Sequence, residues 1–249
     1  MLYTNLYVPS TYSSKRPSAD VLVSRYIKEW EVQKEKAKQA AKKENIVMPP
    51  CICFSRPIGV GALEIADIIS EKTKYRVVDR QILEKISTQA NISEYTASIF
   101  DERFPGQIEQ LMGMLFGEKS FAVSDYLKQL TKALLSIAHI ETTIFVGRGA
   151  YLILPRDRIL AVRIIGSKDY RINRVAKIMN ISNDVAAKEV ACIDKDQNDF
   201  FKKLYGKSEV GASEFDLVLC RDHIKNAQDT AEIILFAFKQ KFGAELDKC

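Results

Sequence analysis

Short apolar runs alternate with segments of helical periodicity from about residue 51 to the end of the chain. Strands are predicted for Ile52–Phe54, Tyr75–Val78, Thr143–Val146, Ile159–Ile165 and Leu217–Cys220. Unbroken apolar strands separated by helices are typical of a parallel sheet that helices cover on both faces. The pattern therefore predicts a three-layer α/β domain, whose ligands lie beyond the carboxyl ends of the strands.

Segments with helical spacing fill the intervals between the predicted strands. Helices are predicted for Ala62–Lys72, Gln81–Gln89, Ser93–Ile99, Gln107–Phe116, Ser124–His139, Lys168–Met179, Asn183–Lys203 and Ile224–Phe242. In the last of these, Ala227, Ala231, Ile234, Phe238 and Phe242 share one face, which is the spacing of a helix packed on a core.

The first 46 residues differ in character from the rest, and we divide the chain into an N-terminal extension (1–46) and a main domain (47–249). The extension begins with an irregular segment, and Ser18 then caps a helix whose apolar side is Leu22, Tyr26 and Trp30. After Val32 the apolar positions stop. Two interpretations stay open: a solvated helical spacer, or an arm that docks a protein partner through Tyr26 and Trp30.

Composition narrows the function classes. The net charge of +5 favours anionic ligands but is too small to indicate nucleic acid. No apolar run is long enough for a membrane span and no signal pattern opens the chain, so we expect a cytoplasmic protein, either monomer or dimer. Two histidines and five cysteines without a C-x-x-C pair argue against a zinc site or a Ser-His-Asp triad.

A glycine-containing loop between a predicted strand and a predicted helix is the strongest sign of chemistry. The sequence from Ser55 reads Ser-Arg-Pro-Ile-Gly-Val-Gly-Ala and ends at Ala62. Amides at a helix start bind anions, so Ser55, Arg56, Gly59, Val60, Gly61 and Ala62 are candidate phosphate-binding residues. The loop is not a Walker A motif, because Ala62 and Leu63 occupy the places of its lysine and hydroxyl. A tight turn without a ligand is the alternative, and side chains filling the space over the loop would favour it.

Further charged residues follow other predicted strands or lie on later helices. Asp79 and Arg80 follow one strand, and Arg148 stands between two glycines after another. An arginine flanked by glycines can turn its guanidinium toward a phosphate. Arg171, Arg174 and Lys195 lie on two later helices, where they would either form a lid over phosphates or remain solvated surface charges.

These motifs together resemble the cytidylate kinase-like family of P-loop proteins, over about four-fifths of the chain. The resemblance rests on Ile52–Arg56 with Gly59-Val60-Gly61 and Glu64-Ile65-Ala66, Val78-Asp79-Arg80 with Ile82-Leu83, Asp101-Glu102-Arg103, Val146–Ala150, Asp194-Lys195 and Phe215-Asp216-Leu217. It implies a P-loop NTPase-like domain with a helical lid, which transfers a phosphoryl group from ATP to CMP or dCMP with Mg²⁺.

The same resemblance implies roles for individual residues. Ser55–Ala62 would wrap the ATP phosphates, and Asp79, Arg80 and Arg148 would face the monophosphate. Arg148, Arg171, Arg174 and Lys195 would be the catalytic cations. Glu64 would approach magnesium or only cap its helix.

The chain departs from the family pattern at two places. Ala62 and Leu63 stand where the family usually has a glycine and often an arginine, and Gln197 stands where the lid commonly has an arginine. Losing a preorganised cation at the transferring phosphate costs on the order of 10³ in rate. Two functions therefore stay open: a working nucleoside monophosphate kinase, and a degenerate nucleotide-binding module that acts as a sensor or binds a protein partner.

Overall fold

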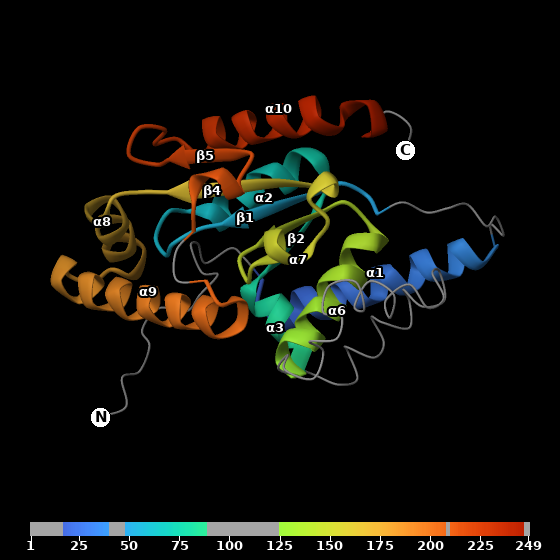
Figure 1. Cartoon of the computed structure of the whole chain (residues 1–249), viewed down its shortest axis with the longest axis horizontal. Coiled ribbons are helices and arrows are strands. Elements are labelled where there is room, and N and C mark those ends of the chain that lie inside the picture. The colour runs from blue at the N-terminus through green and yellow to red at the C-terminus, as the bar shows by residue number, and fades with distance from the viewer. Residues whose placement is uncertain (1–16, 40–47, 89–124, 208–209, 247–249) are drawn as a thin grey trace.

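The centre of the computed structural model is a sheet of five parallel strands in the order β2-β3-β1-β4-β5 (Figure 1). The structure describes residues 17–39, 48–88, 125–207 and 210–246. The strands are β1 Cys51–Ser55, β2 Arg76–Asp79, β3 Thr143–Val146, β4 Ile159–Ile165 and β5 Leu217–Cys220. All five predicted strands are confirmed, and so is the α/β class.

Helices cover both faces of the sheet and its carboxyl end. They are α1 Ala19–Gln39, α2 Ala62–Thr73, α3 Arg80–Thr88, α6 Asp125–Ile140, α7 Ala150–Ile153, α8 Lys168–Met179, α9 Asn183–Tyr205 and α10 Ala227–Leu246, with 3-10 turns η2 Arg156–Arg158 and η3 Ala212–Glu214. One core layer lies under α2 and α10, and another lies under α1, α3, α6 and α7. The pair α8–α9 lies beyond the strand ends (Figure 1). The helices predicted at Ser93–Ile99 and Gln107–Phe116 fall outside the described residues.

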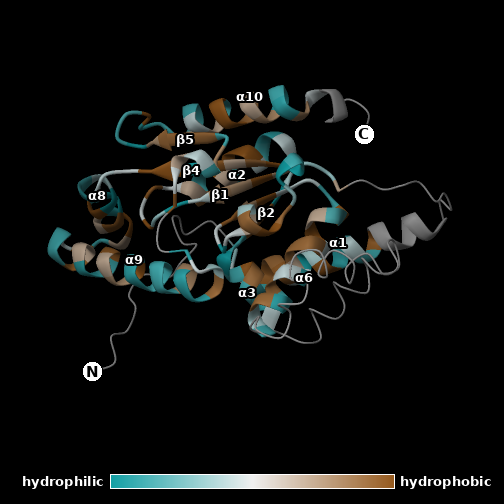
Figure 2. Ribbon diagram, in the orientation of Figure 1, coloured by the Kyte–Doolittle hydropathy of each residue, from teal (hydrophilic) through white to brown (hydrophobic). Residues whose placement is uncertain are grey.

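Alternation along the strands explains both core layers and sets which polar groups face which side. In β1, Ile52 and Phe54 join the layer under α2 and α10, whereas Cys51 and Cys53 join the opposite layer. Most of the length of the strands is accordingly hydrophobic in Figure 2. Ser55 and Arg163 are register partners in β1 and β4, and alternation places both on the α3–α7 side of the sheet.

The N-terminal helix is part of this core. Trp30 is fully buried, and its indole N–H donates to Glu141 at 2.9 Å. The Tyr26 hydroxyl donates to the carbonyl of Val77 at 3.0 Å, and the Arg76 guanidinium lies 4.3 Å from the centre of the Tyr26 ring. The interpretation of α1 as an arm that docks a partner through Tyr26 and Trp30 is therefore wrong, because both rings are buried against the chain's own sheet and helices.

The predicted start of the last helix at Ile224 is also wrong, since α10 begins at Ala227. Arg221 is only 2 % exposed, and its guanidinium donates to the carbonyls of Ile224, Lys225 and Asn226 and to the Thr230 hydroxyl. These bonds hold residues 221–226 as a turn ahead of the helix. Among the described residues, no helix combines the length and the apolar character needed to cross a membrane.

Candidate functional site

The loop between β1 and α2 has the geometry of an anion cradle. Gly59 and Gly61 have φ angles of +87° and +78°, which favour glycine strongly. Gly61 is the N-cap of α2 and brings no side-chain cap, so the amides of the first helical turn have no partner within the helix. Ile58 and Val60 are buried and anchor the loop from below. The backbone amides therefore face outward from a fixed support.

The helices α8 and α9 are docked on this loop. Ile58 packs into a small cluster with Val175, Val190 and Ile193 of these helices. Arg171 donates to the carbonyl of Ile58 at 3.3 Å and to both oxygens of Asp194 at 2.8 and 2.9 Å. A Cβ at Gly59 would lie 2.9 Å from the backbone oxygen of Arg171, so only glycine permits this approach.

Arg174 lies directly over the amide cradle. Its guanidinium atoms are 3.0–3.1 Å from the position that a Cβ at Gly61 would occupy, and its Nη2 donates to Glu64 at 2.6 Å. The cavity left beside the loop is about 40 Å³, room for a few waters. A side chain therefore fills the space over the loop, as expected for a turn that binds no ligand. That side chain is the cationic Arg174. A polyphosphate can enter only when this side chain moves, and the guanidinium is a phosphate ligand in its own right.

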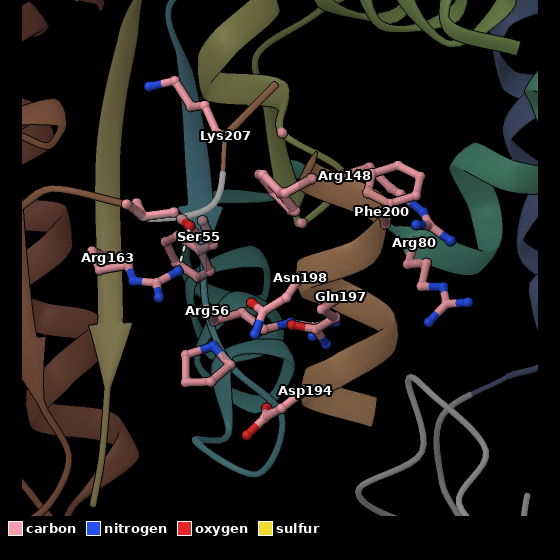
Figure 3. A pocket seen from close by; sticks show the side chains of 16 residues that line it. Ser55, Arg56, Arg80, Arg148, Arg163, Asp194, Gln197, Asn198, Phe200 and Lys207 are labelled. Atoms are coloured by element: carbon pink, nitrogen blue, oxygen red, sulfur yellow. Dashed lines mark hydrogen bonds between the residues drawn. The ribbon is translucent and has the colours of Figure 1, made fainter. Parts of the chain in front are cut away.

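A second, larger cavity of about 220 Å³ lies on the other side of Arg56 (Figure 3). Its walls carry an excess of positive charge from the cations Arg56, Arg80, Arg148, Arg163 and Lys207, set against the single carboxylate of Asp194. Gln197, Asn198 and Phe200 of α9 close it from the lid side. This excess of positive charge favours an anionic ligand in the cavity.

Arg148 is held in an unusual backbone conformation at the centre of this cavity. Gly147, Arg148 and Gly149 all have positive φ, and at the arginine (+53°) this conformation costs on the order of 1 kcal/mol. The guanidinium pairs with Glu84 and lies 4.0 Å from the centre of the Phe200 ring. Burial, and next the positive charges of Arg80 and Arg56, lower the pKa of Arg148 to about 9. An entering anion would relieve this desolvation and repulsion.

Asp79 and Arg80 mark the edge of the same region. Asp79 is 3 % exposed, lines the smaller cavity, and accepts a hydrogen bond from the amide of Ile82 at 3.0 Å, which caps α3. Arg80 lines the larger cavity and pairs with Glu84 at 3.2 Å. Glu84 thereby fixes both Arg80 and Arg148.

The structure gathers most of the residues that the sequence singled out. Ser55, Arg56, Gly59–Ala62, Glu64, Asp79, Arg80, Arg148 and Arg174 line one or both cavities, and Arg171 braces the lid against the loop. Lys195 is exposed on α9 and lines neither cavity, so the fold does not bring it to the site. Its neighbour Asp194 does line the larger cavity.

Sequence reasoning missed Arg163 and Lys207. Arg163 carried a readable signal, because it is the one charged residue within the apolar run Ile159–Ile165. Lys207 follows the end of α9 and carried none.

Comparison with protein families gives a match to the cytidylate kinase-like family over residues 51–223. The chain belongs to this family. Among curated proteins the comparison finds no relative.

Comparison with solved structures gives matches at low sequence identity. An uncharacterized protein from Eubacterium ventriosum is similar with a TM-score of 0.51 and 17% identity, over 73% of this chain and 98% of the other. A shikimate kinase from Bacteroides thetaiotaomicron matches with a TM-score of 0.38 and 12% identity, over 77% of this chain and 96% of that one.

Proposed function

We propose that the protein transfers a phosphoryl group from ATP to CMP or dCMP. The observation that carries the proposal is the placement of two cation-lined cavities on either side of Arg56, one beside the amide cradle and one beside Arg80 and Arg148. A donor polyphosphate on the cradle and an acceptor phosphate in the larger cavity would meet at this residue. The cytoplasmic location expected from the sequence is part of this proposal.

Each group has a task in this reaction. The amides of Gly59–Ala62 bind the outer phosphates of ATP, and Arg174 supplies the cation that the loop lacks. Arg80 and Arg148 hold the acceptor phosphate in the larger cavity, whereas Asp79 lines the smaller one. Since phosphoryl transfer needs little covalent participation from the protein, the rate comes from alignment, exclusion of water and charge neutralisation. Arg171 acts through position, because its pair with Asp194 and its bond to Ile58 keep the lid on the loop.

Magnesium fits the smaller cavity. Glu64 and Asp79 both line it, and Mg²⁺ in kinases commonly takes one or two carboxylates together with substrate phosphates. No cluster of three metal-ligating side chains occurs among the described residues, so phosphate oxygens would complete the coordination. The ion would supply positive charge that offsets the charge of the phosphates. Glu64 would hold the magnesium ion once it has released Arg174, with which it is paired here.

The alternative, a nucleotide-binding module without efficient transfer, is favoured by one observation. Arg171 and Arg174, the two lid arginines, are each paired with a carboxylate, Asp194 and Glu64. If these pairs persist when nucleotide is bound, neither arginine reaches the transferring phosphate. Gln197 at the larger cavity adds no charge in their place.

A coupled assay of ADP release distinguishes the two functions. Purified protein is given ATP, magnesium and each of the common nucleoside and deoxynucleoside monophosphates in turn. We expect turnover with CMP or dCMP that is lost in Arg148→Ala and retained in Arg25→Ala, a change at an exposed residue of α1. Melting shifts with ATP but no turnover with any acceptor would establish the binding module instead. Neither turnover nor ATP-dependent stabilisation would contradict both.

A further inference from the structure

Arg163 is a cation placed on a core strand without an acidic partner. It lies in β4 between Val162 and Ile164, both fully buried, and its side chain reaches the larger cavity (Figure 3). Its Nη1 donates to the Ser55 hydroxyl at 2.7 Å. Among the described residues no carboxylate lies within ion-pair distance of it. Burial lowers the pKa of Arg163, although the more distant carboxylates of Glu214 and Asp194 act in the opposite direction. A partly buried guanidinium whose bonded partner is neutral is incompletely compensated.

A second polar group beside Arg163 is also incompletely satisfied. Tyr151 is 6 % exposed, and its hydroxyl has no hydrogen-bond partner among the described residues. Burial, and next the charge of Glu214, raise the pKa of Tyr151 to about 12, whereas Arg163 and Ser55 act in the opposite direction. Buried hydroxyls are ordinarily bonded. Arg163 and Ser55 form a donor group on the wall of the larger cavity, and Tyr151 lies beside this group but lines neither cavity.

This donor group is separate from the residues proposed to hold the acceptor phosphate. Arg163 lies on β4 and Arg148 follows β3, with β1 between them. Neighbouring strands are about 4.8 Å apart, so the two backbone positions are roughly 10 Å from each other across the sheet. Figure 3 shows Arg163 with Ser55 on one side of the cavity and Arg80, Arg148 and Phe200 on the other.

We propose that Arg163 and Ser55 form a second anion subsite, and that the acceptor carries a second anionic group, a phosphate or a carboxylate, in addition to its phosphoryl-accepting phosphate. The inference rests on the proposed function, because it takes Arg80 and Arg148 as the site of the first phosphate. The preferred substrate is then a nucleoside monophosphate that carries one additional anionic group, rather than the monophosphate alone. Arg163 is a specificity-determining residue in this scheme.

Matched ligand pairs that differ by one anionic group test the inference. Calorimetry compares CMP with cytidine 3′,5′-bisphosphate, and UMP with orotidine 5′-monophosphate, which adds one carboxylate. We expect the wild-type protein to prefer the more charged member of at least one pair on the order of tenfold. The pair that shows the preference identifies the chemistry of the second group. Equal affinity within both pairs overturns the inference.

Substitution of Arg163 assigns the preference to this subsite. In Arg163→Gln, which removes the charge and shortens the side chain but keeps an amide donor, the preference should fall to within about twofold, while monophosphate affinity is unchanged. Arg163→Lys keeps the charge without the planar fork, and should retain part of the preference; it replaces the glutamine variant if that protein does not fold. Arg25→Gln is the control and keeps the full preference. A preference that survives in both Arg163 variants overturns the proposal.

Turnover of the same ligands separates this inference from the proposed function. Phosphorylation of CMP without any preference in binding would leave the kinase standing and remove the second subsite. An Arg163-dependent preference without phosphorylation of any ligand would establish the subsite and remove the proposed transfer.

Discussion

Substitution of Arg174 by glutamine tests whether a lid residue supplies the cation that the loop lacks. The change removes the guanidinium that lies 3.0–3.1 Å from the Cβ position of Gly61, and leaves a shorter, neutral amide side chain. An arginine that neutralises a transferring phosphoryl group is worth 10³-fold or more in rate. We therefore expect kcat to fall about 10³-fold, which corresponds to about 4 kcal/mol in the activation free energy.

The same substitution should hardly affect stability, so a fall in kcat can be assigned to the missing guanidinium. The pair between Arg174 and Glu64 joins side chains that are 22% and 32% exposed, so its loss costs about 1 kcal/mol or less in the free energy of unfolding. Urea denaturation checks this. Lys177→Gln, three residues further along the exposed side of α8, is the matched control and should change neither kcat nor stability.

Steady-state ADP release is measured for the wild type, Arg174→Gln, Arg174→Lys and the control. The lysine variant should regain at least tenfold over the glutamine variant, because an ammonium reproduces the charge but not the fork. A glutamine variant with kcat within threefold of the wild type would refute the role of Arg174. A variant that turns over faster than the wild type would show that the guanidinium obstructs the cradle.

Three further outcomes follow from the described contacts. In Glu64→Gln, the factor by which Mg²⁺ increases ATP affinity should fall about tenfold. ATP affinity in EDTA should be unchanged or higher, because Arg174 loses its carboxylate partner. Calorimetry that finds the same magnesium effect in the variant would contradict the metal role of Glu64. Gly59→Ala should lower the free energy of unfolding by about 2–3 kcal/mol, since it adds a backbone clash to a positive φ. Gly206→Ala, at a positive φ but in open space, should cost only about 1 kcal/mol. Equal losses in urea titrations would contradict the close contact between Gly59 and α8. Burial raises the pKa of Asp216, but hydrogen bonds from Arg156, the Ala161 amide and Lys241 bring it below its usual value. Asp216 therefore stabilises the fold above pH ~4 and loses this effect as pH falls through its folded pKa; Asp216→Asn should cost about 1–2 kcal/mol at pH 7 and progressively less below pH ~4, and a cost that does not change with pH would disprove the linkage.

Local patterns were sufficient to predict the sheet and most of its helices. Five apolar runs became five strands, and Lys168–Met179 was predicted with its observed bounds. These predictions succeed because strand burial and helix periodicity are properties of neighbouring residues. The four-residue helix α7 was not predicted, since so short a segment shows no periodicity.

Contacts between distant segments could not be predicted in this way. Trp30 is bonded to Glu141, more than a hundred residues away, and no local pattern shows this contact. The amphipathic pattern of the N-terminal helix therefore fitted a surface for a protein partner as well as a place in the core. The turn at 221–226 depends on the buried Arg221, whose guanidinium donates hydrogen bonds to carbonyls of that turn and so keeps them out of the helix. Arg163 joins the site through strand register with Ser55, which only the order of the strands determines.

The position of Arg174 has a consequence for how nucleotide binding and lid position are related. A lysine in a Walker A loop is part of the phosphate cradle whether the lid is open or closed. Here the loop contributes amides alone, and the guanidinium comes from α8, which is held to the loop by Ile58, Arg171 and Asp194. If Arg174 binds the phosphates, the charge of the cradle is complete only while α8 is docked. Affinity for ATP and closure of the lid then become one equilibrium, because a ligand that binds the docked state more tightly must also populate it. Weakening the contact between Arg171 and Asp194, as in Asp194→Asn, should therefore reduce ATP affinity in calorimetry, although Asp194 does not line the cavity beside the cradle. An unchanged ATP affinity would contradict this link.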